Sequence, residues 1–285
     1  MKFENTKVFN FEGALRGMRN PLDSWKKSDS SFGMFSWEPD DNAWEIAEAY
    51  YGNKDWRNSE DDEEIATAET EIDEIQQWLI DQGVQYDNNS DMGTWTFIGP
   101  NDMNLAQRLI RGGPEHRKFL RQIAVSVDIT APFYWWKEFD TYKVGTVANS
   151  CSTMHKLTSY PISYENFEME DFNGDLNPYE GNALNPGTTV KTIWDNLLVD
   201  CENLRRIYLE TKDVRYWKEL VRILPSGWLQ KRTVTLNYEN LRAMYSQRKN
   251  HKLTEWHDFC NWVKALPYAE DLILYGLPGE EVASD

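Results

Sequence analysis

The sequence predicts an α+β fold, and two observations support this prediction. Two segments have the pattern of β-strands, 122–130 and 228–236, and they lie far apart in the sequence. Several segments whose apolar residues recur at helical spacing separate them. Few strands with several helices between them are typical of α+β proteins. The chain has 285 residues and no strong linker, so we expect a single domain over 1–285.

The first hundred residues are acidic and aromatic, and most of their expected elements are short. Such elements are expected at 11–18 and 43–50, and a longer helix is expected from Ser59, which suits its N-cap. The acids at 60–64 suit the positive end of that helix's dipole. They follow no metal-ligand spacing, so a solvated helix face is favoured over a metal or partner site.

After residue 100 the patterns are clearer. A helix is predicted at 101–111 and ends in a Gly-Gly-Pro run. In the strand at 122–130, aliphatic residues alternate with Ala, Ser, Asp and Thr, and Pro132 suits the first turn of an aromatic helix at 133–143. The other expected elements are loops at 144–160 and 173–187, helices at 190–211, 214–223, 238–248 and 254–266, the second strand at 228–236, and a frayed acidic tail after Leu277.

The chain carries 47 acidic against 30 basic side chains, a net charge of −17. This acidity argues against binding of a nucleic-acid polymer, because such proteins usually have a basic surface. No run of about eighteen apolar residues is present, so no membrane span is expected. The N-terminus has no signal-peptide pattern, and the expected location is the cytoplasm.

Three cysteines, Cys151, Cys201 and Cys260, are far apart and have no metal-ligand spacing, so no metal site is predicted. They are interpreted as buried or neutral thiols in a reducing compartment. Cys151 and His155 also suggest a thiol nucleophile with its base. Closeness in sequence is weak evidence for such a pair, so the neutral-thiol interpretation is favoured.

One segment, Arg222 to Lys252, is basic within this acidic chain. It holds seven Lys or Arg and one acid, a local charge of +6, and such an island is either a solvated helix face or an anion site. Asn237 follows the predicted strand, and Arg248 lies eleven residues later, close to three helical turns, so both point the same way. A helix start and an arginine fork suit a phosphate or a pyrimidine edge. From the residues alone, both interpretations stay open.

The spacing in this segment resembles the C-terminal motif of the flavin-dependent thymidylate synthase family. In that motif a Leu-Pro pair is followed at fixed intervals by an Asn and then by a catalytic Arg. This sequence keeps both intervals, twelve residues from Pro225 to Asn237 and eleven from Asn237 to Arg248. Arg222 lies near the family's phosphate-binding arginine, one residue out of place.

A second block resembles the same family, in which a strand, Ala-Pro and a short helix lead into R-H-R-x-x-S-x-N-E-x-S-x-R-Y. Here a strand, Ala-Pro and a helix lead into T-Y-K-V-G-T-V-A-N-S-C-S-T-M-H. His116 matches a histidine that the family places near the flavin. Thr141, Tyr142 and Lys143 stand in the place of R-H-R, and Thr146 stands in the place of the first Ser. After one inserted residue, Asn149, Ser150 and Ser152 correspond to N-E-x-S. Met154-His155 then replace Arg-Tyr.

The resemblance covers roughly 105–160 and 220–262. It implies a small, mostly antiparallel sheet flanked by helices, with 1–100 as an N-terminal helical extension, 101–275 as the synthase-like core and 276–285 as the tail. It also implies reductive methylation at C5 of a pyrimidine nucleotide such as dUMP. FAD, NADPH and methylenetetrahydrofolate would be used, in a homotetramer.

The same resemblance implies roles for individual residues. Arg248 would be catalytic and would polarise the pyrimidine carbonyl–imide edge. The cofactor-binding residues would be His116, Lys143, Thr146, Asn149 and Asn237. The substrate-binding residues would be Ser150, Ser152, Lys156, Arg222 and Arg242.

Two departures from the family motif keep a rival hypothesis open. Of the fixed cations of R-H-R only Lys143 remains. Losing two charge-assisted hydrogen bonds of about 1.5–3 kcal/mol each weakens flavin binding about a hundredfold or more. The family's substrate-binding Arg is replaced by Thr153 or Met154, with Lys156 nearby to compensate. The rival is a non-catalytic homologue that binds a nucleotide or a protein partner.

Overall fold

The computed structural model describes residues 1–35, 93–179 and 187–279. The elements expected at 43–50 and from Ser59 lie outside these residues. The chain divides into two compact units, the first formed by Met1–Thr6 and Val127–Thr235 and the second by Lys7–Ser126 and Leu236–Asp285. The single domain with boundaries at 100 and 275 stays a prediction.

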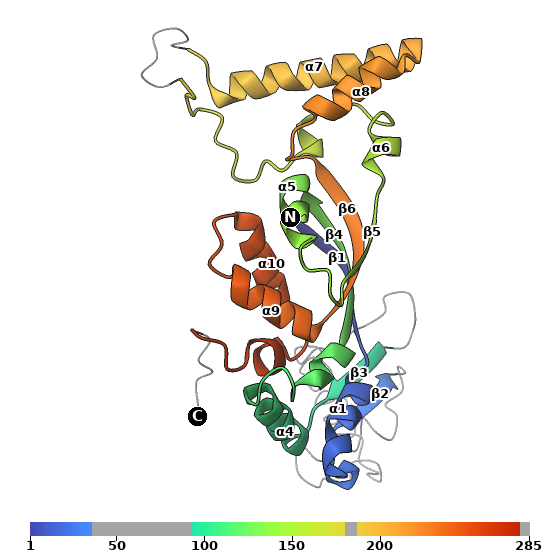
Figure 1. The fold of residues 1–285 in the computed structure, drawn as a ribbon, viewed down its shortest axis with the longest axis vertical. Helices are drawn as coiled ribbons and strands as arrows, with labels where there is room; N and C mark the ends of the chain where they lie inside the picture. Colours follow the sequence, from blue (N-terminus) through green and yellow to red (C-terminus); the bar gives the residue numbers. More distant parts are fainter. Residues whose placement is uncertain (36–92, 180–186, 280–285) are drawn as a thin grey trace, which may run out of the picture. The chain divides into compact units, whose positions relative to one another are not determined.

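The secondary structure is labelled as in Figure 1. The strands are β1 (Lys2–Phe9), β2 (Ser31–Phe35), β3 (Gly93–Phe97), β4 (Ala124–Pro132), β5 (Val147–Ser150) and β6 (Leu229–Asn237). The α-helices are α1 (Phe11–Arg19), α4 (Pro100–Arg111), α5 (Phe133–Phe139), α6 (Thr153–Lys156), α7 (Val190–Thr211), α8 (Val214–Ile223), α9 (Tyr238–Arg248) and α10 (Thr254–Lys264). Short helical turns are η1 (Asn20–Leu22), η2 (Trp25–Lys27), η4 (Lys118–Gln122), η5 (Tyr164–Asn166) and the π-helical η6 (Ala269–Leu274).

The main sheet has four strands in the order β1-β4-β6-β5, and β2 and β3 form a separate antiparallel pair. β5 pairs antiparallel with β6. β4 and β6 are also antiparallel: Phe133 N donates to the carbonyl of Trp228, and Tyr238 N donates to the carbonyl of Ile123, both at 3.1 Å. The predicted small antiparallel sheet with flanking helices is confirmed (Figure 1).

Both predicted strands are present, shifted by one or two residues. β4 alternates as expected, with Val125, Val127 and Ile129 buried and the residues between them partly exposed. β6 begins one residue after its predicted start and ends at Asn237. The helices at 190–211, 214–223 and 238–248 are confirmed as α7, α8 and α9, with the expected bounds.

Four strands, β1, β2, β3 and β5, were not predicted from the sequence, and for β1 and β5 the local reason is visible. Asn5 lies inside β1 with φ at 53°, in the left-handed region, and interrupts the period-two pattern of that strand. All four residues of β5 are exposed, so this edge strand has no apolar alternation to find. The prediction of a loop throughout 144–160 is therefore wrong, because this segment contains β5 and α6. The aromatic helix ends at Phe139, four residues earlier than predicted.

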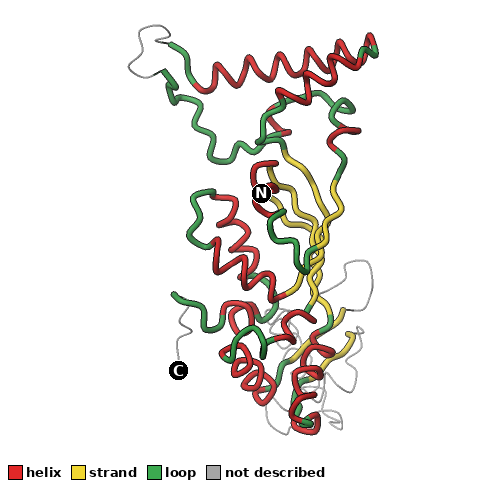
Figure 2. The backbone as a smooth tube through the Cα atoms, in the orientation of Figure 1, coloured by secondary structure: helices red, strands yellow, loops and turns green. Residues whose placement is uncertain are grey.

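In the first unit, α7 and α8 pack side by side as a helical hairpin (Figure 1). Asp213 caps α8 by accepting a hydrogen bond from the backbone N–H of Arg215. Between α6 and α7 the described chain is mostly loop (Figure 2). Its buried residues Leu157, Ile162 and Phe167 form a core with residues of the hairpin, namely Leu198, Cys201 and Leu220. No helix in the described part of the chain is long and apolar enough to cross a bilayer.

In the second unit, α9 packs against α10, η4 and η6, and α1 packs against α4 and η4. Tyr238, the first residue of α9, is fully buried. Its ring meets that of Phe11 edge-on, with centroids 5.7 Å apart, and its hydroxyl donates to the carbonyl of Pro267 at 2.6 Å. A buried tyrosine hydroxyl with a partner adds specificity to the apolar packing.

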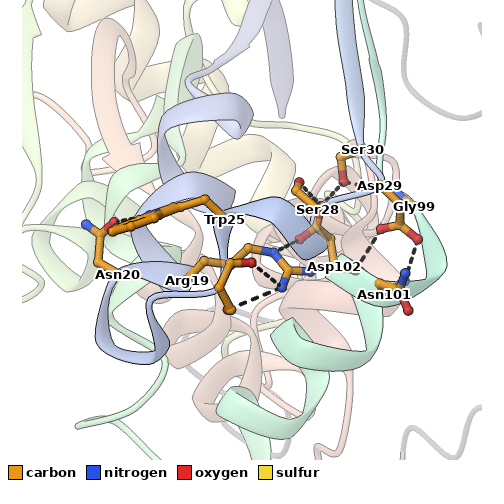
Figure 3. A network of polar contacts seen from close by, with 10 residues as sticks. Arg19, Asn20, Trp25, Ser28, Asp29, Ser30, Gly99, Asn101 and Asp102 are labelled. Atoms are coloured by element: carbon orange, nitrogen blue, oxygen red, sulfur yellow. Dashed lines mark hydrogen bonds and ion pairs between the residues drawn. The ribbon is translucent and has the colours of Figure 1, made fainter.

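A buried carboxylate, Asp102, anchors the polar network of the second unit (Figure 3). Arg19 Nε donates to Asp102 Oδ1 at 2.5 Å, and both residues are at most 4% exposed. The hydroxyls of Ser28 and Ser30 donate to Asp102 Oδ2 at 2.5 and 2.6 Å. Asp29 accepts from the backbone N–H groups of Asn101 and Asp102, in the first turn of α4.

Burial alone raises the pKa of the Asp102 carboxyl. The hydrogen bonds from Ser28, Ser30 and Arg19, together with the charge of Arg19, outweigh burial and bring that pKa below 3.8. The ionised carboxylate therefore stabilises the folded state at neutral pH. This contribution is lost as the pH falls through the lowered pKa.

We expect Arg19→Met to lower the free energy of unfolding by about 3–5 kcal/mol, because it leaves a buried carboxylate without its cation. Urea titration followed by circular dichroism measures the change. Arg16→Met is the matched control, since Arg16 on the same helix pairs with Glu12 in the open, and about 0.5 kcal/mol or less should be lost. Equal losses in the two variants would contradict the role given to the buried pair.

The stability difference between wild type and Arg19→Met should shrink as the pH is lowered from 7 toward 3. Below its lowered folded pKa, Asp102 is protonated in wild type too, and the ion pair no longer stabilises the folded state. Urea titrations at several pH values test this. A difference that stays constant with pH would show that Arg19 stabilises the fold by packing alone.

Candidate functional site

A cavity of about 560 Å³ lies in the first unit and is the candidate functional site. Its size falls within the range of small-ligand pockets, about 300–1,000 Å³. Apolar, hydroxyl-bearing and charged side chains line it together. These are Phe133, Trp136, Lys137, Asp140, Ser150, Cys151, Ser152, Leu157, Val221, Leu224, Ser226, Gln230 and Arg232.

Strand pairing brings the segment after β5 to the cavity. Ser150 is paired with Arg232 in the ladder between β5 and β6. Just beyond, Cys151 N donates to the carbonyl of Lys231 at 2.9 Å, and Gln230 Nε2 donates to the carbonyl of Cys151 at 2.9 Å. The segment is therefore held against β6 although β5 has only four residues.

One face of β6 changes from apolar to polar at the cavity. Val234 and Leu236 are buried, at 0% and 1% exposure. Gln230 and Arg232 share this face, because side chains two residues apart on a strand point the same way. A cation on the core-facing side of a strand costs free energy unless polar partners satisfy it. The cavity and its polar lining supply that setting.

Three contacts hold the Arg232 guanidinium in one orientation. It lies over the Trp136 ring, 4.2 Å from the ring centroid. Its Nε donates to Gln230 Oε1 at 2.9 Å, and its Nη1 donates to Asp140 Oδ1 at 2.7 Å. Trp136 in turn donates Nε1–H to the carbonyl of Gln230 at 3.0 Å. The arginine fork is therefore pre-organised before any ligand arrives.

Two of the predicted substrate-binding residues, Ser150 and Ser152, line this cavity. Lys156 ends α6 as an exposed residue and is outside the lining. Arg222 is exposed in the last turn of α8, where it pairs with Glu219. The structure thus brings the two serines together, while Lys156 and Arg222 lie outside this cavity.

The predicted cofactor-binding residues of the first unit lie before and within β5. Lys143 is exposed and has no ion-pair or hydrogen-bond partner among the described residues. Asn149 is exposed on β5, opposite Thr233 of β6. The Thr146 hydroxyl donates to the carbonyl of Tyr142.

The other predicted site residues belong to the second unit. Asn237 caps α9, with its Oδ1 accepting from the backbone N–H of Asn240 at 3.0 Å, which confirms the predicted helix start. Arg248 is the last residue of α9 and is half-buried, with its guanidinium 4.7 Å from the centroid of the Trp256 ring. His116 is exposed after the end of α4.

Arg242 is buried in α9 and supports the C-terminal part of the second unit. Its Nη1 donates to the carbonyls of Ile273 and Tyr275 at 2.7 and 2.8 Å. Burial and the nearby charge of Arg117 lower the pKa of Arg242 to about 10, against an opposing effect of Glu239. The side chain stays charged at neutral pH, and its substrate-binding role stays a prediction.

Only Ser150 and Ser152 of the cavity lining were predicted as site residues, and the residues not predicted include Trp136, Lys137, Gln230 and Arg232. The aromatic segment around Trp136 was interpreted only as a helix, and no motif marks Lys137. For β6 a signal was present, since Gln230 and Arg232 continue the alternating row that is apolar at Val234. Polar residues in a core-facing row indicate a cavity or a buried network.

In each unit by itself, the predicted cofactor residues offer donors of a kind that a flavin accepts. In the first unit the Lys143 ammonium and the Asn149 amide are exposed. In the second unit the Nδ2 group of Asn237 has no hydrogen-bond partner among the described residues. Such groups suit the phosphates and ring carbonyls of FAD. No three His, Cys, Asp or Glu side chains in the described ranges are grouped so that they hold a metal ion.

Solved structures that resemble this chain exist, and two of them come from Helicobacter pylori. Thymidylate synthase X from Helicobacter pylori, solved with FAD and dUMP, matches with a TM-score of 0.54 and 13% identity. The match covers 96% of this chain and 97% of that one. A second structure, the flavin-dependent enzyme of the same organism with FAD and dUMP, matches with a TM-score of 0.42 and 17% identity over 62% of this chain and 83% of that one. No family model and no curated protein matches the sequence.

The chain therefore has the fold of the flavin-dependent thymidylate synthases, an α+β class with a small antiparallel sheet. The resemblance expected from its two motifs is confirmed at the level of the fold. At 13% identity the match over nearly the whole chain establishes the fold alone.

Cys151 provides a chemical probe of the cavity. It is exposed and lines the cavity, whereas Cys201 and Cys260 are buried, and burial together with the charge of Asp200 raises the pKa of Cys201 to about 11. At pH 7.5 we expect N-ethylmaleimide to modify Cys151 at least about tenfold faster than the two buried thiols. The thiolate is the reactive form, and burial in apolar surroundings disfavours it and limits access of the reagent.

Intact-mass measurement over time follows this labelling, and Cys151→Ser is the control that should remove the fast phase. Fast modification that persists in this variant would show that Cys151 is not the accessible thiol.

Proposed function

We propose that this protein is a flavin-dependent thymidylate synthase-like enzyme that transfers a one-carbon unit to C5 of a pyrimidine nucleotide such as dUMP. One observation carries the proposal: Asn237 and Arg248, the motif pair, bracket α9 in a chain with the synthase fold. β6 delivers the chain to Asn237, Asn237 caps the helix, and Arg248 ends it. The thymidylate synthase X structure with this fold holds FAD and dUMP.

In this proposal Arg248 polarises the carbonyl–imide edge of the pyrimidine. A guanidinium offers paired N–H donors in one plane, which match such an edge and stabilise negative charge that develops on it. The Trp256 ring under the guanidinium limits its motion, so less entropy is lost when the base binds.

The cofactor-binding residues in the proposal are His116, Lys143, Thr146, Asn149 and Asn237. FAD, when bound, supplies the hydride chemistry, and NADPH and methylenetetrahydrofolate supply the reducing equivalents and the one-carbon unit. Lys143 holds a phosphate of the cofactor, and the amides of Asn149 and Asn237 orient it. The assembly is a homotetramer in the cytoplasm.

A second candidate function is supported by a specific observation. Thr141, Tyr142 and Lys143 occupy the positions of R-H-R, so the first unit presents one cation where the family has two fixed arginines. This favours a non-catalytic homologue that keeps a nucleotide site for binding or regulation. Flavin binding separates the two candidates, because the enzyme requires it and the binding protein does not.

Titration of FAD with the purified protein is the first test. If the enzyme hypothesis holds, FAD fluorescence changes on binding, and Lys143→Gln weakens that binding about tenfold or more through loss of a charge-assisted hydrogen bond. Lys118→Gln, an exposed lysine paired with Glu115, is the matched control and should leave binding unchanged. Colourless protein and unaltered FAD fluorescence at excess protein would exclude the flavin enzyme.

Arg248→Ala tests the nucleotide anchor. We expect dUMP binding, measured by isothermal titration calorimetry, to weaken by about tenfold or more, because one charge-assisted contact is lost. Lys252→Ala, an exposed cation of the same basic segment, is the control that should bind as wild type does. Unchanged dUMP affinity in Arg248→Ala, with the fold intact by circular dichroism, would refute the anchor assignment.

A further inference from the structure

We propose that the cavity of the first unit binds a phosphate group, and that Lys137 and Arg232 supply its positive charge. The inference rests on the proposed function only in naming a nucleotide or a flavin as the carrier of that phosphate. Neither residue was assigned a role from the resemblance, and both line the cavity.

Lys137 is a cation without a partner at the cavity wall. It lies in α5, is exposed, and has no ion pair or hydrogen bond to a side chain among the described residues. An ammonium group has three N–H donors and no acceptor. An anion in the cavity is therefore the partner that fits it.

Arg232 is a second cation, and its position on the core-facing side of β6 costs free energy because the charge is partly removed from water. It lies on the face of β6 that is buried at Val234, and its side chain is 15% exposed. Its Nε and Nη1 groups are already satisfied, by Gln230 and Asp140. Its Nη2 group has no hydrogen-bond partner among the described residues. A fixed arginine with one open edge suits an oxyanion.

The rest of the lining fits a phosphate ester. Lys137 and Arg232 against Asp140 leave one net positive charge, and Asp140 is engaged by Arg232. The hydroxyls of Ser150 and Ser152 add donors without adding charge. Aromatic and aliphatic side chains also line the cavity and suit the ring or sugar that carries the phosphate.

Lys137 and Arg232 also replace a positive charge that the family's motif has and this chain lacks. The family's substrate-binding Arg is replaced by Thr153 or Met154, which carry no charge. Lys137 from α5 and Arg232 from β6 supply cations to the cavity that Ser150 and Ser152 line. The charge that holds the phosphate would thus come from the helix and the strand instead of from the loop.

The experiment uses protection of Cys151 from N-ethylmaleimide in the full-length chain. Cys151 lines the cavity, and protection is measured against the unprotected labelling rate of the same variant, so a change in the reactivity of the thiol itself does not affect the comparison. Inorganic phosphate, dUMP, FAD and deoxyuridine are compared as protectants. We expect dUMP and inorganic phosphate to slow the labelling and deoxyuridine, which has no phosphate, to protect at least about tenfold less well.

Lys137→Gln is the decisive variant, since an exposed residue without a partner can be changed while the fold is kept. We expect it to raise the dUMP concentration for half-protection by about tenfold, and Arg232→Gln by at least as much. The controls are Lys218→Gln, an exposed lysine outside the lining, and Arg215→Gln, which breaks an exposed pair with Asp213. Both should match wild type.

The outcomes separate the possibilities. If FAD protects Cys151 and dUMP does not, and if Lys137→Gln abolishes the protection by FAD, the phosphate site is supported and is assigned to the flavin. Equal protection by deoxyuridine and dUMP, no protection by any phosphate compound, or an unchanged half-protection concentration in Lys137→Gln overturns the proposal. Absence of FAD binding and of thymidylate formation, with phosphate protection retained, refutes the proposed function and leaves this inference standing.

Discussion

Strand β6 is hydrogen-bonded along both edges, to β4 and to β5, and this pairing sets the positions that the candidate site depends on. Its register places Arg232 opposite Ser150. A slip of one residue would turn Gln230 and Arg232 to the opposite face and bring Lys231 inward. The same strand ends at Asn237, so its register also determines where α9 begins.

The cavity has a polar wall because the apolar row of β6 is interrupted at Arg232. Closing the cavity with an aliphatic side chain there would bury more apolar area and remove a cation that needs partners. The chain instead keeps Arg232 and supports it with the Trp136 ring, Gln230 and Asp140. Support of this kind is typical of positions kept for binding, since a rigid donor loses little entropy when a ligand arrives.

Three arginines with low exposure differ in what their guanidinium groups contact. Arg19 is closed onto the carboxylate of Asp102, and Arg242 donates to backbone carbonyls of the C-terminal segment. Both contacts stabilise the fold. Arg232 also pairs with a carboxylate, but it borders an open cavity. Burial and charge alone therefore do not distinguish a binding arginine from a structural one, and the space beside it does.

Local signals made the long helices predictable from the sequence. Helices α7, α8 and α9 begin after Thr189, Asp213 and Asn237, each of which caps its helix with a side-chain oxygen. Strand β5 had no such signal. It is a four-residue edge strand with every side chain exposed, and only its hydrogen bonds to β6 make it a strand.

The sequence by itself determined the α+β class, the bounds of α7, α8 and α9, and the strand that precedes Asn237. These follow from periodicity and helix starts, which act between residues near in the sequence. The resemblance of two motifs to the flavin-dependent thymidylate synthases indicated the fold that the chain shares. Only the tertiary structure decided that Ser150 and Ser152 meet Lys137 and Arg232 in one cavity. That meeting depends on pairing between β5 and β6, about eighty residues apart in the sequence, and no local pattern encodes such a contact.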